Sequence, residues 1–243
     1  MLVSHSKKFI FLKSKKTAGT SVREYFLKYC ISPESEITRH MPETFTEFGI
    51  TSAKGEYANV FNKTQGEHIP SVKLKILLDN IDVNIWKTYY KFSIIRNPYN
   101  IVISAFFYYG LTTRRPLLFP MFSMQAQIQA FNDPIPEKIK TYFRLWVKHE
   151  LPFIHLNSDY IFKIGTELVP DFFIKLETIN DDMEILCNKL NIKWEPDTFS
   201  KFNIGHNKPN WVTPEILYDD ESKQLVKELF SFQIEHFNYD FPK

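Results

Sequence analysis

The sequence predicts an α/β protein with a mostly parallel central sheet and helices on both of its faces. Short apolar runs typical of strands alternate along the chain with amphipathic, helix-like segments, and two of these runs are each followed by a polar turn and a helix. Such alternation favours parallel strands covered by helices. The 243 residues, 44% of them hydrophobic, suffice for a single domain over residues 1–243, although a division into two domains is also compatible with this length.

The first predicted unit is a strand at residues 8–13 followed by a helix. Ser21 and Glu24 have the spacing of a capping box at the start of that helix. Its apolar face repeats with helical periodicity through Val22, Tyr25, Phe26, Tyr29 and Cys30. Residues 31–70 contain several Pro and Gly residues, so we expect a long connection there with small elements of its own.

The second predicted unit follows a short helix at residues 71–79. It consists of a strand at 89–95 and a helix for which Asn97 is the N-cap and Pro98 the first residue. The core-facing side of this helix is predicted to contain Ile101, Val102, Ala105, Phe106 and Tyr109.

The remaining elements are a loop, a third strand and further helices. We expect a loop at 107–136, mobile over residues 110–136, a helix at 137–150, a strand at 172–177 and a helix ending near Leu190. Thr213 and Pro214 have the pattern of a helix start, and a last helix is predicted at 219–231.

Composition and charge exclude several classes of protein. Thirty basic against 28 acidic residues are too balanced for a protein that coats nucleic acid. Cys30 and Cys187 are both predicted to be buried thiols, and no Cys/His spacing indicates a metal site. The chain shows no signal-peptide pattern and no apolar run of membrane-spanning length, so we expect a cytoplasmic protein unless the chain is an excised lumenal domain.

The segment from Phe9 to Val22 has the pattern of an anion site. A short strand leads into a loop of small residues with a lysine pair, and then into a helix whose amides and dipole favour negative charge. Lys15 and Lys16 precede Gly19, whereas the usual nucleotide loop GxxxxGK[ST] places its lysine after the glycines. An ordinary ATP or GTP loop is therefore a poor match, and a phosphate-bearing ligand is the better prediction.

Four stretches together resemble the carbohydrate-type branch of the PAPS-dependent sulfotransferases. Phe11-Leu-Lys-Ser-Lys-Lys-Thr-Ala-Gly-Thr-Ser21 is similar to the family's 5′-phosphosulfate loop, FxHxPKTAGTS. Phe92-Ser-Ile-Ile-Arg-Asn-Pro-Tyr-Asn-Ile-Val-Ile-Ser104 is similar to its 3′-phosphate motif, FxxVRNPYDRLVS. Residues 173–182 and 237–241 look like its later strand and C-terminal signature. The resemblance implies a P-loop-like, three-layer α/β/α fold.

This chain departs from the family pattern at several positions. Lys13 and Lys15 stand where His and Pro are common, and both add positive charge to the loop. Asn100 and Ile101 replace the usual Asp-Arg pair, and Lys175 stands where the family often has Arg. These differences indicate a divergent member of the family and do not identify the acceptor.

The resemblance implies a role for each matching residue in binding PAPS, whose spent form is PAP. Lys16 would neutralise the oxygen that leaves with the nucleotide, as positioning and electrostatics dominate such transfers. Arg96 and Ser104 would hold the 3′-phosphate, because the Arg fork suits phosphate. Lys208 could approach the nucleotide from the C-terminal loop. The residues expected at the 5′-phosphosulfate are Lys16, Thr17, Ala18, Gly19, Thr20 and Ser21.

Transfer to a hydroxyl also calls for a general base, and His68 is our first candidate. His40 is the second, and Glu43 or Glu67 could serve if the base is a carboxylate. The resemblance points to a carbohydrate or glycolipid acceptor, which the aromatic residues at 107–122 could contact if they are not core or dimer contacts. Alternatives are a kinase that uses ATP and Mg²⁺, a nucleotide-binding module without activity, and a structural interaction protein.

Overall fold

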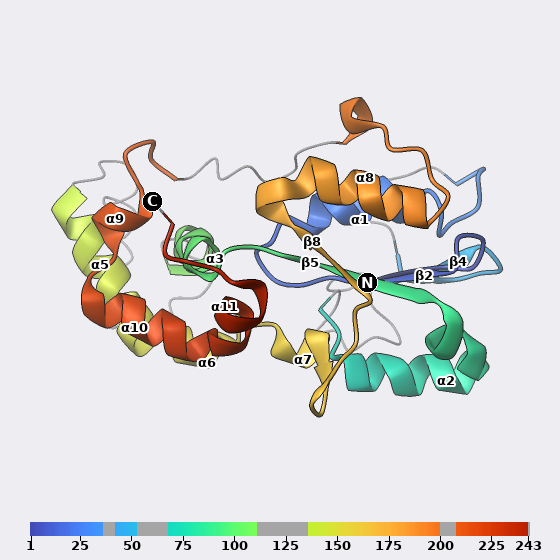
Figure 1. Cartoon of the computed structure of the whole chain (residues 1–243), viewed down its shortest axis with the longest axis horizontal. Coiled ribbons are helices and arrows are strands. Elements are labelled where there is room, and N and C mark those ends of the chain that lie inside the picture. Colours follow the sequence, from blue (N-terminus) through green and yellow to red (C-terminus); the bar gives the residue numbers. More distant parts are fainter. Residues whose placement is uncertain (36–41, 53–67, 111–135, 200–207, 243) are drawn as a thin grey trace. The chain divides into compact units, whose positions relative to one another are not determined.

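The structure is a computed structural model that describes residues 1–35, 42–52, 68–110, 136–199 and 208–242 (Figure 1). The chain divides into two compact units. We call them the sheet unit, Met1–Ile95 with Ser158–Phe202, and the helical unit, Arg96–Asn157 with Asn203–Lys243.

The sheet unit is built on a six-stranded sheet in the order β3-β4-β1-β2-β5-β8. Strands β2, β5 and β8 are parallel neighbours, and the pairs β1–β2, β1–β4 and β3–β4 are antiparallel. The strands are β1 (Leu2–Ser4), β2 (Phe9–Leu12), β3 (Thr44–Phe45), β4 (Gly49–Thr51), β5 (Tyr90–Ile95) and β8 (Phe172–Lys175).

The sheet is therefore mixed, and the mixed α/β class is confirmed. Strands β4, β2, β5 and β8 run in one direction, whereas β1 and β3 run in the other. The three strands predicted from the sequence are the three that form the parallel part. Strands β1, β3 and β4 have only two or three residues each, too few for a periodic pattern to reveal.

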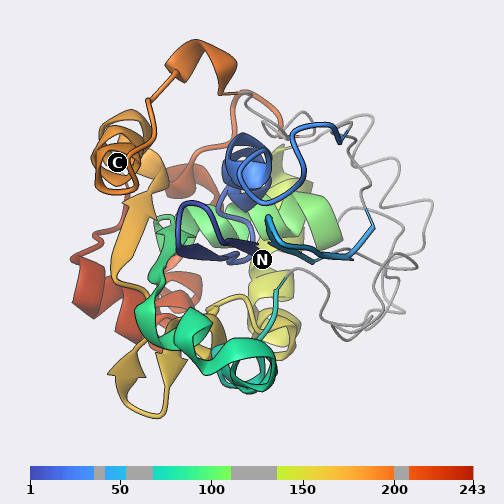
Figure 2. The same ribbon diagram turned by 90° about the vertical axis from the view of Figure 1, so that its right-hand side faces the viewer.

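Helices cover both faces of this sheet. Helices α1 (Gly19–Leu27) and α8 (Ile179–Lys189) lie on one face, and α2 (Ser71–Thr88) lies on the other (Figures 1 and 2). The core beneath α1 is aromatic: the ring of Phe92 on β5 lies 5.1 Å from the rings of both Phe11 and Phe26. Cys30 and Cys187 are free and buried in the same core, as predicted.

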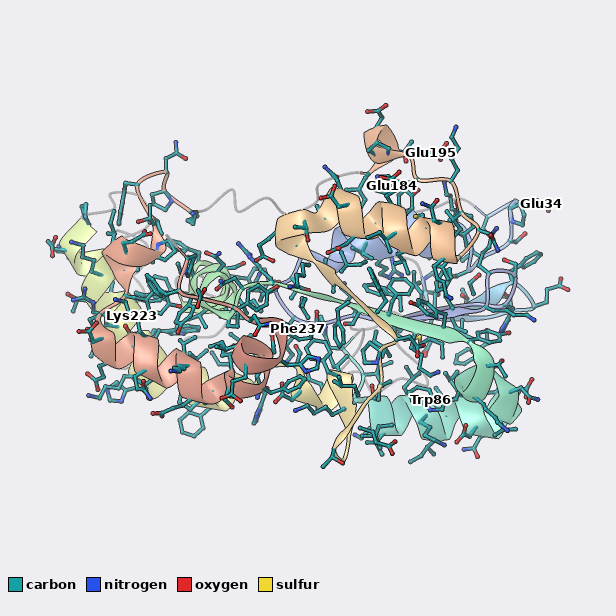
Figure 3. The ribbon with its side chains drawn as sticks, in the orientation of Figure 1. Glu34, Trp86, Glu184, Glu195, Lys223 and Phe237 are labelled. Carbon is teal, nitrogen blue, oxygen red and sulfur yellow. The ribbon has the colours of Figure 1, made fainter. Side chains whose placement is uncertain are left out.

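Two helices differ from their predicted bounds. Helix α1 begins at Gly19 with Ala18 as its N-cap, so Ser21 is not the cap and the capping-box prediction is wrong. Helix α2 is twice as long as predicted and is interrupted at Asp82, whose backbone is extended. Its last turn carries Trp86 (Figure 3), and the ring of Trp86 lies 5.3 Å from the ammonium of Lys91 on β5.

The helical unit packs helices around a second aromatic core. Asn97 is the N-cap of α3, where its side chain accepts a hydrogen bond from the Tyr99 amide (3.1 Å), and Pro98 is the first helical residue, as predicted. The hydroxyl of Tyr218 donates to the Tyr99 carbonyl at 2.9 Å. The elements are α3 (Pro98–Ala105), a π-helix (Phe106–Gly110), α5 (Pro136–His149), α6 (Leu151–Ile154), α9 (Pro214–Leu217), α10 (Asp220–Leu229) and α11 (Ser231–Phe237, with Phe237 labelled in Figure 3).

The helix predicted at 219–231 is α10, and the further helix that follows it, α11, was not predicted from the sequence. Phe230 lies between them with a backbone that is not helical, and it is buried in the core of the helical unit. The remaining elements of the sheet unit are α7 (Asp159–Phe162), the hairpin β6 (Lys163–Ile164) and β7 (Glu167–Leu168), and 3₁₀ turns at Leu176–Thr178 and Pro196–Thr198. None of the helices in the described part of the chain is long and apolar enough to cross a membrane.

Candidate functional site

The loop of residues 13–18 connects the end of β2 to the start of α1. It turns sharply, since Lys16 and Ala18 both adopt left-handed backbone conformations with φ of 58° and 63°. Non-glycine residues pay a conformational cost there, of order 1 kcal/mol or more each, and such residues cluster at functional sites. Turns of this kind can also direct backbone amides towards a common anion.

Hydroxyl groups hold this loop against the neighbouring strand. The buried Ser14 hydroxyl donates to the carbonyl of Ile94 near the end of β5. Since that donation uses its proton, Ser14 accepts from the Thr17 hydroxyl, which lies 2.8 Å away. Thr17 is 2% exposed, so its side chain supports the loop and only its backbone could serve a ligand. Sequence reasoning missed Ser14, because its partner is 80 residues away.

The loop ends at the N-terminus of α1, where backbone donors are available. No side chain of the described residues caps this helix at Ala18. The Ser21 amide donates to the Ala18 carbonyl at 2.9 Å, so the first-turn amides of Gly19 and Thr20 are the better candidates for binding an anion. Thr20 is half-buried, whereas Ser21 is buried inside the helix.

Lys13 lies across the first turn of α1. A Cβ atom added to Gly19 would come within 2.9 Å of the Lys13 Cγ and 3.5 Å of its Cε. The absence of a side chain at Gly19 thus makes room for the Lys13 alkyl chain. Lys13 itself is 6% exposed, so a cationic residue is almost wholly buried beside the helix N-terminus.

Lys15 and Lys16 lie in different environments. The Lys15 amide lies 3.3 Å from the Ser158 hydroxyl, to which it donates, and its ammonium is 5.5 Å from the centre of the Tyr160 ring. Lys15 is therefore held against the start of α7. Lys16 is half-buried at one of the two left-handed positions. The contacts with Ser158 and Tyr160 had no local signal in the sequence.

His68 contacts the same loop. Its Nδ1 atom lies 3.0 Å from the carbonyl oxygen of Lys13. A carbonyl oxygen can only accept a hydrogen bond, so this contact requires the ring proton on Nδ1. In the neutral ring the Nε2 atom then has the lone pair that a general base needs.

The other base candidates are less well placed or lie outside the described residues. Glu43 directly precedes β3, which is three strands away from β2, or roughly 14 Å at the usual strand spacing. His40 and Glu67 lie outside the described residues. The structure therefore brings His68, and not Glu43, to the loop.

The residues predicted to bind the 3′-phosphate belong to the helical unit. Arg96 directly follows β5 and precedes the cap residue Asn97, whose amide group donates to the Asp240 carbonyl at 2.8 Å. Ser104 is half-buried near the end of α3. The ammonium of Lys208 donates to the Val212 carbonyl at 3.0 Å, a contact within its own loop.

A pocket of about 320 Å³ lies elsewhere in the sheet unit. Ile31, Thr44 and Phe48 contribute to its wall, so it belongs to the β3 side of the sheet and loop 13–18 does not line it. The charged and hydrogen-bonding groups of the candidate site gather instead at loop 13–18. Among the described residues, no three His, Cys, Asp or Glu side chains are grouped so as to hold a metal ion.

In this arrangement the sheet unit joins the 5′-phosphosulfate candidates, Lys16 to Ser21, with the base candidate His68. The helical unit carries Arg96, Ser104 and Lys208. The first group can bind an anion and remove a proton, and the second offers two cations and a hydroxyl. Comparison of the chain with protein-family models, with curated proteins and with solved structures found no match in any of the three.

Proposed function

We propose that the protein is a PAPS-dependent sulfotransferase with a P-loop-like, three-layer fold, acting on a hydroxyl of a carbohydrate or glycolipid. The observation that carries the proposal is the loop of residues 13–18. It combines lysines, left-handed turns and a helix start that no side chain of the described residues caps, and the His68 ring is hydrogen-bonded to it. The motif in the sequence and the chemistry of the loop thus support the same kind of ligand.

In the proposed reaction the acceptor oxygen attacks sulfur while the bond from sulfur to the 5′-phosphate oxygen breaks. The Lys16 ammonium would balance the charge that builds on the leaving oxygen. The amides of Gly19 and Thr20 would hold the 5′-phosphate. The Nε2 atom of His68 would accept the proton of the acceptor hydroxyl, and PAP would leave.

The 3′-phosphate is assigned to Arg96 and Ser104. The guanidinium fork of Arg96 suits two phosphate oxygens, and the Ser104 hydroxyl can donate to a third. Lys208 would have to release the Val212 carbonyl in order to reach the nucleotide. These contacts would distinguish PAPS from nucleotides without a 3′-phosphate.

The test is transfer of labelled sulfate from PAPS to a panel of mono- and oligosaccharides and glycolipids. The wild-type protein should label at least one hydroxyl acceptor, and Lys16→Ala should abolish the labelling. Lys87→Ala is the matched control, because Lys87 is an exposed lysine on α2. Equal labelling by Lys16→Ala and wild type would contradict the assignment of the loop.

A further inference from the structure

We infer that the pocket beside the hairpin of β3 and β4 binds an uncharged sugar unit of an oligosaccharide acceptor. That the ligand is a saccharide rests on the proposed function, whereas its place and its lack of charge follow from the residues of the pocket. One wall is the segment that follows α1 and contributes Ile31, Ser32 and Ser35. The other is the hairpin, in which Glu47 and Phe48 lie in the turn between the two strands.

The two walls of the pocket are held together by close backbone packing. A Cβ atom at Gly49 would lie 2.9 Å from the carbonyl oxygen of Cys30, so the hairpin can approach the segment after α1 this closely only because residue 49 is a glycine. The Phe48 carbonyl also accepts a hydrogen bond from the His5 amide at 3.0 Å. The walls are therefore in place before a ligand binds, which lowers the entropy lost on binding.

Three polar side chains of the pocket have hydrogen-bonding capacity that the described residues leave unused. The Ser32 hydroxyl accepts from the Glu34 amide at 3.3 Å, and its proton has no acceptor among the described residues. Neither Ser35 nor Glu47 makes a side-chain hydrogen bond or an ion pair with any described residue. Two hydroxyls and a carboxylate are thus available to the polar groups of a ligand.

These groups suit a sugar ring without charge. A carboxylate can accept hydrogen bonds from neighbouring sugar hydroxyls, and serine hydroxyls can donate to sugar oxygens. Ile31 and Phe48 add apolar contact for the C–H groups of the ring. The negative charge of Glu47 would repel a carboxylate or sulfate on the sugar. The volume of about 320 Å³ lies at the small end of the range of ligand pockets, as a small ring requires.

The pocket is too far from loop 13–18 to hold the sugar that is sulfated. Strand β3 lies three strands away from β2, or roughly 14 Å at the usual strand spacing. The sugar in the pocket is therefore a different unit from the one whose hydroxyl attacks sulfur, so the acceptor is an oligosaccharide. Contacts this far from the reacting atoms are the same in the ground state and the transition state, so their loss should raise KM without changing kcat.

The test is a titration of the protein with cellotriose, maltotriose and N,N′,N″-triacetylchitotriose, followed by ligand-observed NMR. The wild-type protein should bind at least one of these neutral trisaccharides. Glu47→Ala should weaken that binding about 10-fold, because it removes a charged hydrogen-bond acceptor. The same change should not weaken any binding of trigalacturonic acid, the anionic counterpart. Glu34→Ala is the matched control, since Glu34 (Figure 3) is an exposed carboxylate of the same segment that does not line the pocket.

Far-UV circular dichroism shows whether each variant is folded, and Ser35→Ala is the second variant if Glu47→Ala is not. Equal affinities of the wild-type protein and a folded Glu47→Ala variant overturn the inference, as does a wild-type protein that binds none of the neutral trisaccharides. Either result leaves the proposed function standing if sulfate is still transferred from PAPS. Trisaccharide binding without any transfer from PAPS overturns the proposed function and, with it, the assignment of the bound sugar to an acceptor.

Discussion

The Nδ1 atom of His68 lies 3.0 Å from the carbonyl oxygen of Lys13. Residues 55 positions apart thereby connect the segment just before α2 to the loop after β2. The contact fixes which ring nitrogen carries the proton. It also means that a change at His68 affects both the proposed base and the support of the loop, so the two roles need separate variants.

His68→Asn separates these roles. The Asn side-chain amide can donate to the Lys13 carbonyl in place of Nδ1, but it has no basic nitrogen. We expect PAP affinity to be retained and the rate of sulfuryl transfer to fall by about 10²–10⁴-fold, the usual contribution of a general base. His68→Ala should slow sulfuryl transfer by a similar factor and should also weaken PAP binding, because it removes the hydrogen bond to the Lys13 carbonyl. Transfer at the wild-type rate by His68→Asn would place the base elsewhere.

Ser14→Ala should weaken both the fold and the loop. It removes the donor to the buried Ile94 carbonyl and the nearer acceptor of the Thr17 hydroxyl, which keeps only the Ser14 carbonyl at 3.4 Å. The expected loss is about 1–3 kcal/mol in the free energy of unfolding, measured by urea titration. PAP affinity should fall as well.

Ser93→Ala is the matched control for Ser14→Ala. Ser93 is buried on β5 and donates to the Leu12 carbonyl at 2.6 Å, so it also joins the two strands. Ser93→Ala should lower the free energy of unfolding by a similar amount without weakening PAP binding. Equal effects of the two variants on PAP affinity would show that Ser14 supports the sheet and not the ligand loop.

Gly19→Ala should be destabilising although alanine is the better helix former by about 1 kcal/mol. The new methyl group would lie 2.9 Å from the Lys13 Cγ, which belongs to the base of the side chain and cannot easily move away. In a Lys13→Ala background the methyl group has space. A double-mutant cycle on urea unfolding should therefore give a favourable coupling between the two changes, and simple additivity would contradict the observed packing.

Stability should decline in alkaline solution because of the buried thiols. Burial raises the pKa of Cys187 from 9.0 to about 11 and raises the pKa of Cys30 as well. The folded state therefore retains thiol protons that the unfolded chain releases, and stability falls as the pH rises from 9 through 11. Titration of Cys187 alone should lower the free energy of unfolding by about 1 kcal/mol at pH 10. Urea unfolding at pH 7.5 and pH 10 tests this, and Cys187→Ala should show a smaller decline.

The elements that follow from local sequence were predicted, and those that depend on distant contacts were not. Asn97 and Pro98 start α3 as expected, because a cap and a first-turn proline act within a few residues. Ser21 has the same kind of local signal, yet α1 begins two residues earlier. Ser21 lies buried within the helix that follows the sharp turn of loop 13–18.

In the candidate site, too, the contacts between residues far apart in the sequence could not be predicted. The lysine loop and His68 were identified from motif and position, but the contact that joins them spans 55 residues. The anchoring of Ser14 to Ile94 and of Lys15 to Ser158 spans 80 and 143 residues. The motif also did not indicate that Gly19 makes room for the Lys13 side chain, which occupies the space where a Cβ of residue 19 would lie.

Thermal unfolding with PAP, beside ADP, AMP and ATP with Mg²⁺, tests the central claim most directly. At about 100 times its Kd, PAP should stabilise the protein by about 2.7 kcal/mol, or roughly 5–10 °C for a chain of this size. Arg96→Ala should abolish the shift, because it removes the proposed partner of the 3′-phosphate. A shift with PAP alone is the predicted result, whereas a shift with ATP alone, or with none of the four, would contradict the account.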